Sequence, residues 1–196
     1  MQCPLEKISQ WLTEEAANGV AFSQGAVLST VSKNGRPRSR VVGTMLGNDS
    51  IRFHTSPNSR KVSDISHSRY AALTYSLNNS CRSITIEGVL TPLLENTLEK
   101  DWLLYDEKFR QSYWVFGDQS GNAIESIDEL ELQRKKKVNY ETAIKPISFI
   151  GFEFSVIERI SFYTVTDGNF AISNLYEFNS DENHDKKQWQ YSLLVP

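Results

Sequence analysis

The sequence has 196 residues, enough for one sizeable domain and short for two, and its 39% hydrophobic and 23% charged content is ordinary for a soluble globular protein. The formal net charge of −3 argues against a general nucleic-acid binder, and no apolar run approaches the roughly 18 residues that a membrane helix needs. Cys3 and Cys81 form no CxxC pair and the N-terminus lacks the apolar region of a signal peptide, which together predict a cytoplasmic protein without disulfides.

Residues 1–20 are predicted to carry an N-terminal helix, because apolar residues recur at helical spacing from Leu5 to Ala16 and Asn18-Gly19 is a stop signal. Strand-like segments follow in quick succession, and Asn34-Gly35 between the first two is a strong hairpin signal. These segments cover residues 25–32, 38–45, 50–56, 70–77 and 82–93. Strands so closely spaced, and joined mainly by hairpins, predict an antiparallel sheet that curls into a barrel or a sandwich.

Residues 95–140 differ from the strand-rich part of the chain and predict a helical insertion, because Leu98, Trp102 and Leu103 have mostly helical spacing. The alternating pattern of a half-buried strand returns from residue 147 onward. The composition of residues 178–188 favours a mobile loop before a last strand. The chain is therefore predicted to be a single domain over residues 1–196, mainly β (α+β), with the helical segments outside the sheet.

Two cations stand where a helix is predicted to begin. Ser59 is the expected N-cap, and Arg60 and Lys61 fall in the first turn, although the positive partial charge of a helix N-terminus favours acidic residues there. With the hydroxyls of Thr55, Ser56 and Ser59, these cations can hold a phosphate group. The alternative is a solvated basic turn, and this segment judged alone favours that alternative.

A second basic cluster supports the anion site. Arg36, Arg38 and Arg40 follow one another at a spacing of two along a predicted strand, so they share one face. The twist of the strand and the Asn34-Gly35 turn are expected to leave room for only Arg40 to point inward, toward the helix that begins near residue 59. Because this convergence is itself an inference, it makes an anion site no more than equal in weight to a solvated basic turn.

Signatures of common catalytic sites are absent from the sequence. It contains no GxSxG, P-loop, HExxH or GxGxxG pattern. His54, His67 and His184 are scattered without metal-ligand spacing, so no metal site is predicted and each histidine is expected to be a surface or hydrogen-bonding residue.

Six short segments, taken in their order, resemble a known family. They are AVLSTVSKNGRPRSRVV, IRFHTSPNSRKVSDISHSRYAALTYSL, RSITIEGVL, YWVFGDQSGN, IERISFYTVTDGNFAISNLYEF and QWQYSLLVP. Their order and spacing resemble the pyridoxine/pyridoxamine 5'-phosphate oxidase family of FMN-binding split barrels over nearly the whole chain from residue 26. The resemblance implies an antiparallel split β-barrel with flanking helices, and a homodimer that binds FMN at its interface.

The resemblance also implies which residues contact FMN. Arg60 and Lys61 match an Arg-Lys pair that binds the FMN phosphate, Arg40 matches an FMN-binding arginine, and Thr55 matches the threonine of a Tyr-Thr pair in which His54 replaces the tyrosine. Gln119 and Ser120 match a Gln-Ser pair that, in the family, reaches the flavin from the partner subunit. The implied cofactor contacts are Arg40, Val41, Val42, His54, Thr55, Arg60, Lys61, Ser83, Gln119, Ser120 and Tyr163, with Ser83 replacing a glutamine and Tyr163 a tryptophan.

Several positions depart from the family in the part that holds the substrate. Asn169, Ala171 and Ser173 stand where an arginine, a histidine and another arginine are expected, and Met45 replaces a lysine that contacts the substrate phosphate. Losing three charge-assisted hydrogen bonds, each worth roughly 1.5–3 kcal/mol, would weaken binding by about three or more orders of magnitude. The cofactor half of the site is therefore predicted to be retained, and the substrate half to be altered.

The sequence thus predicts an FMN-dependent oxidoreductase that acts on a small molecule. Its substrate is expected not to be pyridoxine 5'-phosphate, or that compound is expected to be a poor substrate. Three alternatives stay open. The chain is a genuine but divergent oxidase of this family that holds its substrate through Arg110 or Arg36, a flavin-binding protein without catalysis, or a split barrel for haem or a deazaflavin. Haem would need an axial histidine in a suitable segment, which makes the last alternative the weakest.

Overall fold

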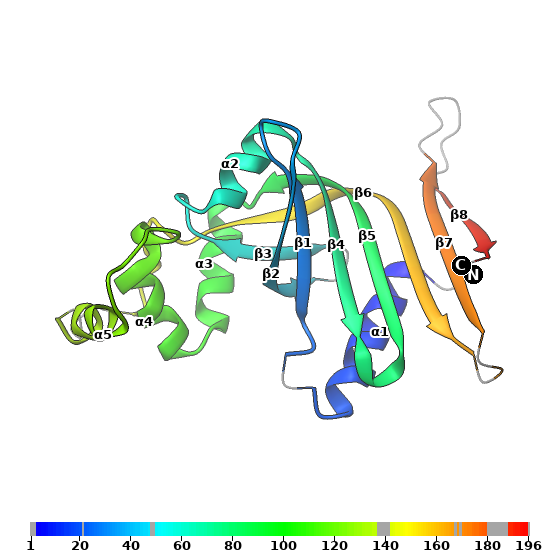
Figure 1. Ribbon diagram of the computed structural model, residues 1–196, viewed down its shortest axis with the longest axis horizontal. Helices are drawn as coiled ribbons and strands as arrows, with labels where there is room; N and C mark the ends of the chain where they lie inside the picture. Colours follow the sequence, from blue (N-terminus) through cyan, green and yellow to red (C-terminus); the bar gives the residue numbers. More distant parts are fainter. Residues whose placement is uncertain are drawn as a thin grey trace.

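Six antiparallel strands close into a barrel, as the family resemblance implied (Figure 1). This computed structural model describes residues 3–20, 22–47, 50–136, 142–166, 168, 170–179 and 188–195. Asn169 and residues 180–187 of the predicted mobile loop lie outside this described part. The barrel strands are β1 (Gly25–Val31), β2 (Pro37–Leu46), β3 (Ile51–Thr55), β4 (Tyr70–Leu77), β5 (Arg82–Pro92) and β6 (Ile150–Val165). Their order is β3-β2-β1-β4-β5-β6, and pairing between β3 and β6 closes the ring.

Alternation of apolar and polar side chains sets the two faces of each strand. In β1, Ala26, Leu28 and Thr30 are buried, whereas Val27 and Val31 are exposed on the outer face. The same alternation recurs in β4 and β5 and places large side chains inside the barrel. The barrel interior is therefore a packed hydrophobic core, which leaves the outer face and the ends of the barrel for binding sites.

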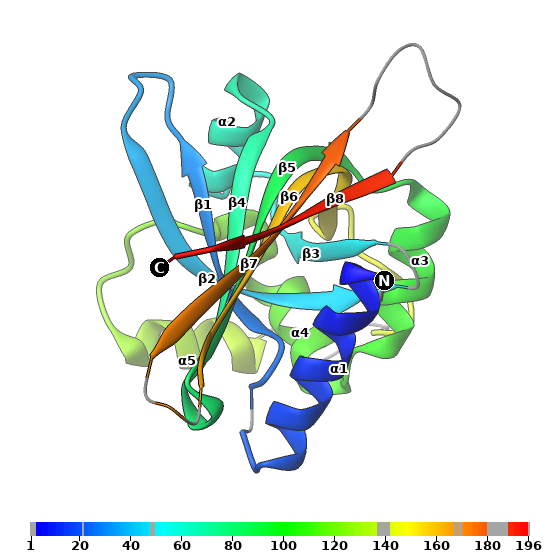
Figure 2. The ribbon, with the colours of Figure 1, turned by 90° about the vertical axis from the view of Figure 1, so that its right-hand side faces the viewer.

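Strand β6 is long enough to belong to two parts of the sheet. Its first residues pair with β3, and its later residues pair with β7 (Ala171–Asn179), which in turn pairs with β8 (Gln188–Leu194). The two views show β7 and β8 as a hairpin that extends away from the barrel (Figures 1 and 2). Register shifts between β5 and β6 at Glu87/Gly88 and Val89/Leu90 accompany the bend of these strands.

Helix α1 (Pro4–Ala17) covers part of the barrel core. Its buried Trp11 meets the ring of Phe162 edge-on, with the ring centroids 5.2 Å apart. Its Glu15 is 3% exposed and accepts hydrogen bonds from the amide of Asn79 and the hydroxyl of Ser80, in the 3-10 turn η1 (Asn78–Ser80). The predicted N-terminal helix is therefore present, and its hydrophobic stripe faces the barrel as its spacing indicated.

The insertion after β5 consists of separate helices packed on the opposite side of the barrel from β7 and β8 (Figure 1). They are α3 (Glu95–Leu104), α4 (Glu107–Phe116), the 3-10 turn η2 (Gly117–Gln119) and α5 (Ile127–Lys136). A small core of Leu93, Leu98, Trp102 and Phe149 holds this layer against the sheet. The chain turns between α3 and α4 at Asp106, whose carboxylate caps α4 by accepting the amide of Phe109 at 2.9 Å. Within the described ranges, no helix has the length and apolar character needed to span a membrane.

Gly88 offers a test of the bend between β5 and β6. A Cβ atom on this residue would overlap the backbone carbonyl oxygen of Val156 on the paired strand, so neither strand can yield without shifting the ladder. We expect Gly88→Ala to lower the free energy of unfolding by about 1–3 kcal/mol, measured by urea titration. Gly43→Ala is the matched control, because a Cβ there meets only the ring of Phe22 at ordinary contact distance. Equal stability of both variants would contradict this account of the bend.

Candidate functional site

A cavity of about 380 Å³ lies between the barrel and the helical insertion. Segments of β2 and β3 and the start of α2 (Arg60–His67) form one side, while α4 and the residues that follow it form the other. The lining residues are Val41, Val42, Gly43, His54, Thr55, Ser56, Lys61, Ser112, Tyr113, Phe116, Gly117 and Ser120. Among these residues Lys61 is the only lysine or arginine, and none is an aspartate or glutamate.

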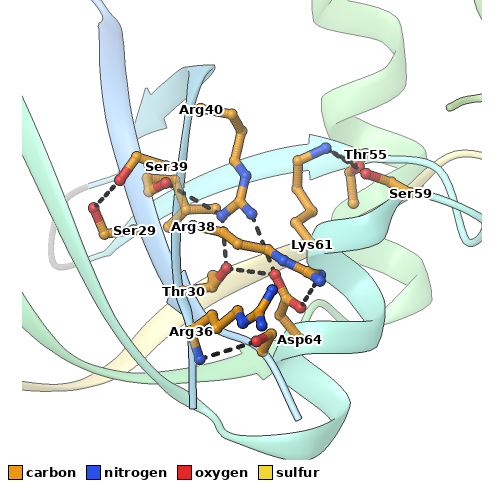
Figure 3. A network of polar contacts seen from close by, with 12 residues as sticks. Ser29, Thr30, Arg36, Arg38, Ser39, Arg40, Thr55, Ser59, Lys61 and Asp64 are labelled. Atoms are coloured by element: carbon orange, nitrogen blue, oxygen red, sulfur yellow. Dashed lines mark hydrogen bonds and ion pairs between the residues drawn. The ribbon is translucent and has the colours of Figure 1, made fainter. Parts of the chain in front are cut away.

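Lys61 brings a half-buried cation to the cavity. Its Nζ donates hydrogen bonds to Thr55 Oγ1 at 3.0 Å and to Ser59 Oγ at 2.6 Å (Figure 3). No carboxylate in the described part of the chain lies within ion-pairing distance of this amine. Burial, and then repulsion from Arg40, lowers the pKa of Lys61. A half-buried amine that has only hydroxyl partners is well placed to accept an anionic ligand.

The start of helix α2 adds further positive potential. Its first turn contains no acidic residue, and Arg60, at the first position, is exposed. Ser59 occupies the predicted N-cap position, but its side chain makes no capping hydrogen bond and instead accepts one from Lys61. The first amides of a helix lack partners within the helix and carry positive partial charge. The helix start and Lys61 together therefore suit a phosphate-like group.

Asp64 joins two arginines of β2 to helix α2 (Figure 3). Its carboxylate accepts from Arg38 Nη1 at 2.8 Å and from Arg40 Nη2 at 3.2 Å, and the hydroxyl of Thr30 donates to it at 2.8 Å. The expectation that only Arg40 would turn inward is therefore wrong. Asp64, 2% exposed, lies within reach of both guanidinium groups because Arg38 and Arg40 are on the same face of β2.

His54 is held by protein groups at both ring nitrogens. Its Nδ1 lies 2.8 Å from the hydroxyl of Tyr105, and its Nε2 lies 3.0 Å from Oδ2 of Asp101. Asp101 also binds Arg52, with its two oxygens 2.6 and 2.8 Å from the guanidinium. An ionised carboxylate can only accept a hydrogen bond, so Nε2 carries the proton and donates to Asp101, and Nδ1 accepts from the hydroxyl of Tyr105. The predicted hydrogen-bonding role of His54 is therefore confirmed, and its ring nitrogens are already occupied at the edge of the cavity.

Hydrogen bonds between the two sides set the width of the cavity. Ser56, at the end of β3, is hydrogen-bonded to the hydroxyl of Tyr113 on α4. Asn58 Nδ2 donates to the carbonyl oxygen of Asp118 in η2 at 2.7 Å. These two contacts hold α4 and η2 against the segment between β3 and α2, and Ser120, directly after η2, lies at the same cavity as Lys61.

The implied cofactor residues differ in their position relative to the cavity. Val41, Val42, His54, Thr55, Lys61 and Ser120 line the cavity, and Arg40, Arg60 and Gln119 adjoin lining residues in the sequence. Ser83 and Tyr163 are paired with each other on β5 and β6 and do not line it. Ser120 lines this cavity within its own chain, and the expectation that it reaches a flavin from the partner subunit stays a prediction.

Among the described positions that depart from the family, none carries a free cation. Met45 is paired with Arg52, but the guanidinium of Arg52 is bound by Asp101. Ser173 and Ala171 lie on β7, and Ser173 is paired with Tyr163. Neither Arg110 nor Arg36, the two cations considered as replacements, lines the cavity.

Sequence reasoning missed the part that helix α4 plays in this site. Ser112, Tyr113 and Phe116 line the cavity, and the spacing of Tyr113 and Phe116 places them on one face of the helix. It also missed Asp64, although this residue is the only acidic one in the segment 60–67 that carries the basic pair. Its position one turn after Arg60 and Lys61 did not reveal its partners, which are Arg38 and Arg40 of β2.

His54 predicts a specific pH dependence of stability. Burial, opposed in part by Asp101, lowers the pKa of His54 to about 4 from its ordinary 6.5. Between pH 6.5 and 4 the unfolded chain therefore binds a proton that the folded chain does not, so stability falls as the pH falls through this window. We expect a loss of up to about 3 kcal/mol from this group in urea titrations, and a smaller loss in His54→Gln. Identical pH profiles of the two proteins would refute the assignment.

Comparisons with known proteins agree with this fold. A sequence model of the family described as pyridoxamine 5'-phosphate oxidase matches residues 12–136. A pyridoxine/pyridoxamine 5'-phosphate oxidase of Cytophaga hutchinsonii is 30% identical over 129 residues, which are 65% of this chain and 59% of that protein. The enzyme of the same name from Alkalilimnicola ehrlichii is 26% identical over 191 residues, 93% of this chain and 90% of that protein. The match to the Cytophaga protein thus spans less than two thirds of that protein's length.

Two solved structures share the whole architecture. PhzG from Burkholderia lata 383, in complex with tetrahydrophenazine-1-carboxylic acid, has a TM-score of 0.84 at 19% identity, covering 98% of this chain and 92% of PhzG. A pyridoxamine 5'-phosphate oxidase-related, FMN binding protein from Nostoc punctiforme has a TM-score of 0.81 at 17% identity, with complete coverage of both chains. At these identities the two structures support the fold alone. From the matched residues, the chain belongs to the pyridoxamine 5'-phosphate oxidase family.

Proposed function

We propose that the protein binds FMN and acts as a flavin-dependent oxidoreductase of the pyridoxamine 5'-phosphate oxidase type. The observation that carries this proposal is the half-buried Lys61, which has two hydroxyl partners and, among the described residues, no carboxylate partner. A phosphate group would complete its hydrogen bonding and compensate its charge. Bound flavin would supply the redox chemistry by accepting a hydride from the substrate, while the protein binds and orients both molecules.

The arrangement around Lys61 suggests how FMN would be held. Thr55, Ser59 and the first amides of α2 would bind the phosphate together with Lys61, and Arg40 would add charge from β2. Tyr113 and Phe116 of α4 supply aromatic surface to the cavity that continues from this point. A polar end and an aromatic wall match the phosphate and the ring system of the cofactor.

We further propose that two copies of the chain form the site. Outward-facing residues of neighbouring strands form an uncharged row, in which Val41 pairs with Val27, Val27 with Thr74, Thr74 with Thr85, and Thr85 with Ser161. Val41 is 64% exposed and also lines the cavity, so this face continues into the site. Ser83 and Tyr163 lie on the same outer face but not at the cavity of their own chain. A partner subunit on this face would supply them.

The substrate that fits best lacks a phosphate group. Beyond Lys61, which the cofactor would occupy, no lysine or arginine lines the cavity. The one cation beside Met45, Arg52, is neutralised by Asp101. Binding a second phosphate would therefore lack the charge-assisted hydrogen bonds that such ligands need, which argues against an efficient vitamin B6 phosphate oxidase.

Removal of the cation pair tests the cofactor site. We expect the purified protein to carry the absorption spectrum of FMN, and Arg60→Ala/Lys61→Ala to weaken FMN binding by roughly 100-fold or more, because two charge-assisted contacts are lost. Arg134→Ala/Lys135→Ala is the matched control, since it removes the same Arg-Lys dipeptide from an exposed part of α5. A protein that takes up no FMN, or unchanged flavin content in the first variant, would contradict the proposal.

An activity assay separates the substrate alternatives. With pyridoxamine 5'-phosphate we expect turnover far below the ~10 s⁻¹ that is typical of enzymes, because the substrate phosphate has no cation to bind. Turnover near that value would instead identify a genuine, divergent oxidase. A protein that keeps its FMN but is reduced by no amine, alcohol or nicotinamide donor would be a flavin-binding protein without catalysis.

The outer face of β1 tests the shared site. Val27 does not line the cavity, so Val27→Glu introduces a charge into the proposed interface without altering the cofactor contacts of its own chain. We expect sedimentation to give a dimer for the parent protein and a monomer with reduced FMN affinity for this variant. Leu104→Glu, on the exposed surface of α3, is the control. A monomeric parent protein with full FMN occupancy would refute the shared site.

A further inference from the structure

Two arginines share one buried carboxylate beside the candidate phosphate site. Arg38 and Arg40 both reach Asp64, whose side chain is 2% exposed, whereas the side chains of Arg38 and Arg40 are 35% and 22% exposed (Figure 3). A buried carboxylate requires a counter-ion, because its charge is costly to remove from water. One cation satisfies that need, so this cluster retains one positive charge.

The distances indicate which arginine serves as the counter-ion. Arg38 Nη1 lies 2.8 Å from Asp64 Oδ1, and Arg40 Nη2 lies 3.2 Å from Oδ2. Nη1 of Arg40 donates instead to uncharged oxygens, at 2.7 Å to the hydroxyl of Thr30 and at 3.3 Å to the carbonyl of Leu28. Arg38 thus makes the shorter ion pair, and Arg40 is held mainly by neutral groups.

The charge of Arg40 acts on the candidate anion site. Repulsion from Arg40 contributes to the lowered pKa of Lys61, after burial. Burial lowers the pKa of Arg40, Asp64 opposes that effect, and repulsion from Arg38 and Arg60 adds to it. Arg40 is therefore close enough to Arg60 and Lys61 for their charges to interact, and an anion placed among the three residues would be attracted by all of them.

We propose that Arg38 is a positioning residue that neutralises Asp64, so that the charge of Arg40 remains available to the phosphate of FMN. The inference rests on the proposed function, because it requires the phosphate to bind beside Lys61. Without Arg38, Asp64 would take Arg40 as its counter-ion and the cluster would be neutral. Arg38 would therefore control phosphate affinity although it does not line the cavity.

The test compares FMN with riboflavin, which has the same ring system without the phosphate. We expect Arg38→Gln to weaken FMN binding by about tenfold, measured by flavin fluorescence quenching at low salt, and to leave riboflavin binding unchanged. Arg38→Lys keeps the charge and should keep FMN affinity near that of the parent protein. In Arg38→Gln/Asp64→Asn the unpaired carboxylate is also gone, so affinity for FMN should recover.

A matched control removes a charge from the same stretch without touching Asp64. Arg36 is exposed at the hairpin before β2, and it forms no ion pair with Asp64 within the described residues. Arg36→Gln should therefore bind both flavins as the parent protein does. We also expect FMN binding to depend less on salt in Arg38→Gln than in the parent protein, and this measurement uses the single variant with Asp64 intact.

The outcomes separate this inference from the proposed function. Unchanged FMN affinity in Arg38→Gln, equal losses for FMN and riboflavin, or no recovery in a folded double variant would each overturn the role of Arg38, even if the protein binds FMN well. A parent protein that binds FMN no more tightly than riboflavin would refute the phosphate site, and the inference with it. Thermal melting of each variant identifies losses that come from unfolding.

Discussion

The pairing of β3 with β6 is the constraint on which the site depends. Strand β3 has only five residues, from Ile51 to Thr55, yet it pairs with β2 on one side and β6 on the other. Because both edges are hydrogen-bonded, the position and direction of the strand end are determined. The chain leaves β3 at Thr55, turns once, and enters α2 with Lys61 directed back at the Thr55 hydroxyl. Barrel closure therefore places a cation at the mouth of the cavity.

The distribution of carboxylates decides which cations remain available to a ligand. Asp101 neutralises Arg52, and Asp64 is shared between two arginines of β2. Lys61, by contrast, has only hydroxyl partners. Positive charge at this cavity is thus concentrated at the start of α2, whereas the charge of Arg52, beside Met45, is compensated by Asp101. This difference links the geometry to the proposed chemistry, because it favours one phosphate, that of a cofactor, over a second one on the substrate.

Strand and helix positions were largely predictable because they depend on local patterns. The alternation in β1 and the Asn34-Gly35 turn indicated the first hairpin, and the structure has Gly35 with a φ of 72° in that turn. The contacts of Asp64 were not predictable, because they join side chains that are 24 to 34 residues apart. Their formation requires the barrel to close first. The same holds for α4, which reaches the cavity through a contact between Tyr113 and the distant Ser56.

The sequence by itself determined the positions of the strands along the chain, the position of helix α2 and the unusual pair of cations in its first turn. It did so because turns, alternation and capping positions involve residues close together in the chain. Only the tertiary structure decided which of the basic residues are neutralised and which remain available to a ligand. That outcome depends on which carboxylates the folded backbone brings within hydrogen-bonding distance, and Asp64 and Asp101 reach their partners only across separate elements.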